Sequence, residues 1–192
     1  MAASQSNSRR TTQRGFSLLE TVGAIFILTV GLLAMAALMS QTTNNSARSR
    51  YMSPASVLTT EKLEELNRYP ASDPVVAVAG ASVGNLNADA SQGGINYFDD
   101  VEISTLAGAI TEVTADSTGT YTTIVHQPDG TITTTTSAAA PPPQPQALRY
   151  HRRWLIEKDV PVVGVRRVTV IVQLTNPPVS KPLTFQMSMV RP

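Results

Sequence analysis

The chain contains no cysteine among its 192 residues. Disulfide bonds, thiol nucleophiles and cysteine metal sites are therefore excluded, whereas an extracytoplasmic location stays allowed. Histidine is scarce as well, because only His126 and His151 occur, and the sequence has no phosphate-binding glycine loop, HExxH or GxSxG motif. Both histidines fall in predicted strands, where we expect them to be surface residues and neither bases nor metal ligands. We therefore expect no enzymatic activity and no cofactor.

The sequence also lacks a strong charge of either sign, since its formal net charge is +1. Nucleic acid and acidic substrates are therefore not expected partners. A local basic patch on adjacent strands is conceivable for five arginines: Arg149, Arg152, Arg153, Arg166 and Arg167. Nearby acids at Glu157 and Asp159 and the small number of aromatic residues argue against nucleic-acid binding there.

A short acidic cluster, Asp99, Asp100 and Glu102, is the nearest approach to a metal motif. Three acids within one strand lack the spaced oxygen ligands of a calcium-binding loop. We therefore expect a solvated strand edge and no metal site.

Residues 16–39 form a mostly apolar run, FSLLETVGAIFILTVGLLAMAALM. As a helix with a rise of ~1.5 Å per residue, this run is about 36 Å long, enough to cross a hydrocarbon core of ~30 Å. Arg9, Arg10 and Arg14 precede it without any acid. The positive-inside tendency places residues 1–15 in the cytoplasm and the remainder outside.

Three ordinary explanations of this run are a secretory signal, a plain membrane anchor and a buried core helix. A signal peptidase would find a small-x-small site at Ala34-Met35-Ala36. However, a signal or a plain anchor has no use for Glu20, because a carboxylate costs several kcal/mol to bury in lipid. A core helix rarely buries so long an apolar run.

The string Arg14-Gly15-Phe16-Ser17-Leu18-Leu19-Glu20 resembles the processing site of type IV prepilins and pseudopilins. The resemblance implies that a prepilin peptidase/N-methyltransferase removes residues 1–15 by cutting after Gly15 and methylates Phe16. It further implies that Glu20, the fifth mature residue, pairs with the amine at Phe16 of a neighbouring subunit. Loss of the leader would change the formal charge from +1 to about −2.

Residues 40–69 are expected to continue the helix, kinked near Pro54, although two abutting helices with Ser53 as a cap are an alternative. Apolar residues at helical spacing should pack on a sheet: Val57, Leu58, Leu63 and Leu66. Tyr69-Pro70 marks the end of the helix.

Residues 70–192 are expected to form an antiparallel β domain of about four to six strands, with loops at 71–94 and 138–147. The predicted strands are 97–104, 121–126, 131–136, 148–158, 165–175 and 183–190. Residues Tyr150 to Trp154 and Val165 to Val172 resemble the C-terminal sheet of PilV-like minor pilins. The fold class is therefore α+β and pilin-like, with a long helix packed on an antiparallel sheet.

The resemblance implies a minor type IV pilin that enters a pilus or primes its assembly, with other pilin subunits as partners. Before assembly the chain would lie in the bacterial inner membrane as a single-pass protein with its C-terminal domain outside, and afterwards in a fibre at the cell surface. A type II secretion pseudopilin is one alternative. A membrane-tethered adhesive or binding domain that never polymerises is another.

Overall fold

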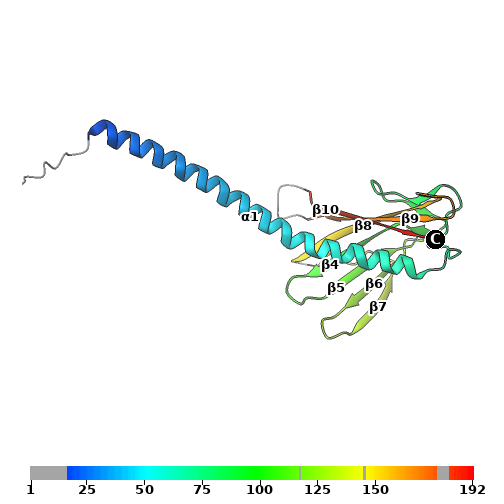
Figure 1. Cartoon of the computed structure of the whole chain (residues 1–192). Helices are drawn as coiled ribbons and strands as arrows, with labels where there is room; N and C mark the ends of the chain where they lie inside the picture. Colours follow the sequence, from blue (N-terminus) through cyan, green and yellow to red (C-terminus); the bar gives the residue numbers. More distant parts are fainter. Residues whose placement is uncertain (1–16, 117, 145, 177–181) are drawn as a thin grey trace, which may run out of the picture. The chain divides into compact units, whose positions relative to one another are not determined.

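The structure of this chain is a computed structural model that describes residues 17–116, 118–144, 146–176 and 182–192. One helix, α1 (Leu18–Arg68), is followed by β-strands in an α+β arrangement, as predicted (Figure 1). The strands are β1 (Ser82–Gly84), β2 (Ser91–Gln92), β3 (Ile95–Asn96), β4 (Phe98–Ser104), β5 (Ile110–Ala115), β6 (Tyr121–His126), β7 (Ile132–Ser137), β8 (Ala147–Lys158), β9 (Arg166–Leu174) and β10 (Thr184–Arg191).

The chain consists of two compact units, residues 1–44 and residues 45–192, so helix α1 contributes to both of them. The helix runs through Pro54 without a break in its assignment. The helix is therefore continuous and is not two abutting helices. Pro54 lacks a backbone N–H, which allows a bend, and the kink near this residue stays a prediction. Within the second unit, residues 45–68 supply the buried helix surface.

The main sheet is antiparallel and has the order β10-β9-β8-β4-β5-β6-β7, with β1 paired to β8 beside that path. It has eight strands, so the prediction of four to six was too low. Strand β5 had not been predicted, and β1 lies in the segment predicted as a loop. The hairpin turn at residues 127–130 connects β6 to β7, where Gly130 N–H donates to the Gln127 carbonyl at 3.0 Å.

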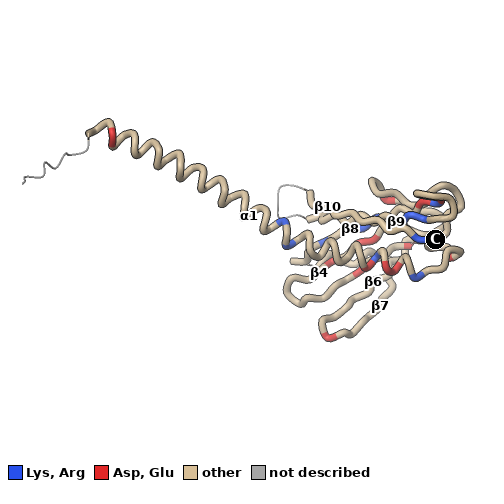
Figure 2. Tube along the Cα trace, viewed as in Figure 1, with Lys and Arg blue, Asp and Glu red and all other residues tan. Residues whose placement is uncertain are grey.

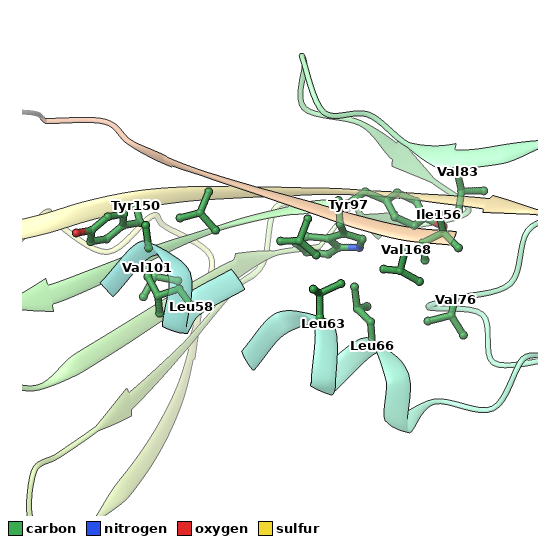
Figure 3. Close-up of a cluster of buried hydrophobic side chains, with 14 of the residues drawn as sticks. Leu58, Leu63, Leu66, Val76, Val83, Tyr97, Val101, Tyr150, Ile156 and Val168 are labelled. Atoms are coloured by element: carbon green, nitrogen blue, oxygen red, sulfur yellow. The ribbon is translucent and has the colours of Figure 1, made fainter. Parts of the chain in front are cut away.

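The core of the second unit lies between α1 and one face of the sheet (Figure 3). Leu58, Leu63 and Leu66 of the helix are buried as predicted. Val57 was predicted to be buried with them, but it is 61% exposed. Successive residues of a helix point in directions about 100° apart, so Val57 faces away from the sheet while Leu58 packs on it. On the sheet side, the core contains the following residues: Val101, Tyr150, Trp154, Ile156, Val168, Val170, Val172 and Leu174.

Strand β8 shows how the two faces of the sheet differ. Its residues Tyr150, Arg152, Trp154 and Ile156 are buried on the helix side, and the residues between them are only partly buried. Cross-strand pairing places Glu102 beside Arg149 and Asp100 beside His151 on the opposite side. We call this second side, which also carries Thr111 and Thr123 of β5 and β6, the outer face.

Candidate functional site

Ser17 caps the N-terminus of α1. Its side-chain oxygen accepts a hydrogen bond from the Glu20 N–H at 3.2 Å, and its carbonyl oxygen accepts one from the Thr21 N–H at 3.1 Å. Glu20 is thus the third residue of the helix, in the S-x-x-E spacing of a capping box. A carboxylate in the first turn also interacts favourably with the positive end of the helix dipole. This capping role had not been predicted, although the spacing of Ser17 and Glu20 is its sequence signal.

The first part of α1 carries apolar side chains on all sides. Its large hydrophobic residues between Leu18 and Met39 are more than half exposed, from 53% at Val30 to 84% at Leu18. Within the described residues, α1 is the one helix that is long and apolar enough to cross a membrane. So much exposed apolar surface marks a segment that contacts lipid or other protein chains.

Glu20 is the single charged residue of this apolar surface. No charged residue occurs between Glu20 and Arg48, and Figure 2 shows the single acidic position near the start of the helix. Gly23 and Gly31 lie in the same charge-free stretch, and a Cβ added at either would meet no atom within 4 Å. The segment therefore offers a single ionic contact within an otherwise apolar contact surface.

Gly15 and Phe16, the predicted cleavage and methylation residues, lie outside the described residues. They directly precede Ser17, so the position predicted for the mature N-terminus is one residue before the helix cap.

The acidic cluster predicted as a solvated strand edge is divided between the two faces of β4. Asp99 is buried on the helix side, where Arg152 Nε lies 2.6 Å and Lys62 Nζ 3.2 Å from its carboxylate. The prediction of solvent exposure was therefore wrong for Asp99. The reason is that Asp99 lies directly opposite Arg152 in the register of β4 and β8, so each provides the other's buried counter-charge.

This group of buried charges includes a carboxylate on β5. Glu112 Oε1 lies 3.4 Å from Arg152 Nη2. Burial raises the pKa of Glu112, and the attraction of Arg152 only partly offsets this effect. Lys62 also stands 4.3 Å from the centre of the Trp154 ring. We call Lys62, Asp99, Glu112 and Arg152 the ionic cluster; it joins α1 to three strands.

His151 is a member of a second charged group, on the outer face. Its Nδ1 lies 2.6 Å from Asp100 Oδ1 and its Nε2 lies 2.8 Å from Asp89 Oδ1. Its side chain is only 12% exposed, so the prediction of a surface strand residue was wrong. His126, at the end of β6, is partly buried.

The five arginines do not form one basic patch. Arg152 is buried on the helix side, whereas Arg149 and Arg153 pair with Glu102 and Asp89 on the outer face. On β9, Arg167 pairs with Glu157 at 2.7 Å. Arg166 donates to backbone carbonyls of the segment that follows the helix.

Comparison with known proteins agrees with the geometry of the N-terminal segment. The prokaryotic N-terminal methylation motif matches residues 10–36. The chain thus carries the type IV prepilin signature, which confirms the resemblance predicted from the string Arg14 to Glu20. No curated protein and no solved structure matches the chain. The likeness of its C-terminal strands to PilV-like minor pilins stays a prediction.

The signature and the apolar helix both fit a membrane-anchored prepilin of the pilin or pseudopilin type. The motif implies processing by a prepilin peptidase and assembly with other pilins.

Proposed function

We propose that the chain is a minor type IV pilin, cut after Gly15, methylated at Phe16 and incorporated into a pilus or into the complex that primes it. The observation that carries this proposal is the uninterrupted apolar surface from Leu18 to Met39 with Glu20 as its single charge. A helix of this kind is stable in lipid as a precursor and in a bundle of like helices after assembly.

In the proposed fibre, the Glu20 carboxylate pairs with the amine of Phe16 in a neighbouring subunit. Cleavage after Gly15 creates that amine, and methylation of an amine keeps its positive charge. A single ionic pair among apolar contacts fixes the axial register of two helices, as a lone buried polar residue does in coiled coils. The cap at Ser17 keeps Glu20 in the first turn of the helix.

The nearest alternative is a type II secretion pseudopilin, which would use the same N-terminal segment. The long connections and the β sheet of residues 70–192 fit either assembly. Phenotype separates the two: loss of a minor pilin reduces surface filaments, whereas loss of a pseudopilin reduces the export of secreted proteins.

Mass spectrometry of the protein from membrane and sheared-filament fractions tests the proposal. We expect an N-terminal peptide that begins at methylated Phe16 in both fractions. A chain that begins at Ala37 would instead identify a removed secretory signal. A chain that retains residues 1–15 would identify a tethered domain that does not polymerise.

A further inference from the structure

The connection from β7 to β8 crosses the outer face of the sheet. β7 and β8 follow one another in the chain, yet β4, β5 and β6 lie between them in the sheet. The connection must therefore pass over these three strands. They pass on the outer side, because the Gln144 N–H donates to Glu102 Oε2 at 2.9 Å and the Gln146 carbonyl accepts from the Thr105 hydroxyl.

This crossing segment contains Pro141, Pro142 and Pro143, which favour a stiff, extended polyproline conformation. The segment is held over the sheet and leaves an open groove of about 390 Å³ beneath it, between residues 140–144 and the strands. This volume is within the ~300 to 1,000 Å³ typical of small-molecule sites. A stiff roof also lowers the entropic cost of ordering the site when a ligand binds.

The floor of the groove carries several hydroxyl groups. Thr111 of β5 and both Thr123 and Tyr121 of β6 line it. Within the described part of the chain, no hydrogen bond joins these three hydroxyls to another residue, so each can donate and accept. Valine methyl groups of the same strands and the proline rings of the roof add apolar surface.

The charged residues of the groove are already balanced. Glu102 Oε1 lies 3.0 Å from Arg149 Nε, and Asp100 Oδ1 lies 2.6 Å from His151 Nδ1. A strongly anionic or cationic ligand would have to compete with these pairs. The paired carboxylates still offer acceptor oxygens, which form strong hydrogen bonds with neutral hydroxyl groups.

We propose that this groove binds a neutral saccharide of one or two rings. Sugars present both hydroxyl donors and acceptors together with apolar C–H faces, which match the hydroxyl floor, the paired carboxylates and the proline roof. The outer face is the side of the sheet away from residues 45–68 of α1, so this part of the helix does not cover the groove. Sugar binding in this groove does not require incorporation of the chain into a fibre.

The test uses the full chain purified in lauryldimethylamine oxide, a detergent without a sugar headgroup. Saturation-transfer NMR with glucose, galactose, N-acetylglucosamine, lactose and maltose identifies a binder, and a titration gives its Kd. We expect saturable binding of at least one sugar. Thr123→Val should raise the Kd about threefold to tenfold, because it removes one hydroxyl at nearly constant shape.

Thr134→Val is the matched control, since Thr134 is an exposed threonine of β7 that lies opposite Ile124 and does not line the groove. It should leave the Kd unchanged, and thermal unfolding should show that both variants are folded. The proposal is overturned if none of the five sugars binds saturably or if the two variants change the Kd equally. Tighter binding of glucuronate or glucosamine than of glucose would overturn the assignment to a neutral ligand.

Discussion

The guanidinium of Arg152 on β8 donates two hydrogen bonds to the carboxylate of Asp99 on β4, at 2.6 Å from Nε and 2.8 Å from Nη2. Both side chains are buried. Burial alone would raise the pKa of Asp99, but the positive charges of Arg152 and Lys62 hold this pKa below its ordinary value. Because Lys62 belongs to α1, the ionic cluster fixes the helix against β4, β5 and β8 at one defined position.

Asp99→Asn should therefore destabilise the protein. The substitution removes the negative charge while two buried cations remain, a change that costs about 3 to 5 kcal/mol in comparable buried pairs. Denaturant unfolding followed by fluorescence measures the effect, because Trp154 is the single tryptophan and lies beside Lys62 in this core. Glu64→Gln, at an exposed position of the same helix, should change the free energy of unfolding by less than about 0.5 kcal/mol. Equal effects of the two substitutions would show that the ionic cluster contributes nothing to stability.

Much of the fold could be predicted because its signals are local. Helical spacing identified Leu58, Leu63 and Leu66 as the buried face of α1. The strands predicted at 148–158 and 165–175 correspond to β8 and β9. The prepilin signature could likewise be recognised from a short contiguous string. In each case, the residues that carry the signal are neighbours in the chain.

The ionic cluster and the His151 group could not be predicted in this way. Asp99 and Arg152 are 53 residues apart, and Asp89 and His151 are 62 apart, so their pairing depends on strand order and register. β1 was missed for a related reason. It has only three residues, Ser82–Gly84, and it is a strand because the longer β8 provides its hydrogen-bonding partner.

Gly84 should tolerate substitution less well than Gly130. It has a φ of +83°, and a Cβ added there would overlap the carbonyl oxygen of Trp154 on β8. Gly84→Ala should therefore cost about 3 kcal/mol or more in the free energy of unfolding. Gly130 has a similar φ of +86° but open space around it, so Gly130→Ala should cost only about 1 to 2 kcal/mol. A smaller loss at Gly84 than at Gly130 in the same denaturant titration would contradict the close approach of β1 to β8.

The charged group around His151 should make stability depend on pH. The hydrogen bond to Asp100, together with that to Asp89, raises the pKa of His151 above its ordinary value despite partial burial. A raised folded-state pKa means that the stabilising contribution is fully present below the unfolded-state pKa of about 6.5 and is lost as the pH rises through the folded-state pKa.

His151→Gln removes this contribution and keeps a side chain that forms hydrogen bonds. The loss in free energy of unfolding should therefore be larger near pH 6 than near pH 9, measured by denaturant titration at about these two values. His126→Gln serves as the control, because His126 forms no ion pair within the described residues. A loss at position 151 that is the same at both pH values would show that the imidazolium charge is not what stabilises this group.

Glu20→Gln is the most direct test of the proposed assembly role. Glutamine fills the same space and suits the third position of a capping box, so the cap at Ser17 and the helix should be retained. Only the negative charge is lost. We expect normal cleavage and membrane insertion. The amount of the chain in sheared filaments, measured by immunoblot relative to the membrane fraction, should fall at least about tenfold. This factor corresponds to about 1.4 kcal/mol, and the loss of one partner of a buried ionic contact costs more than that. Ser17→Ala weakens the cap and keeps the charge, so it should reduce incorporation much less; equal reductions would mean that helix capping and not ionic pairing explains Glu20.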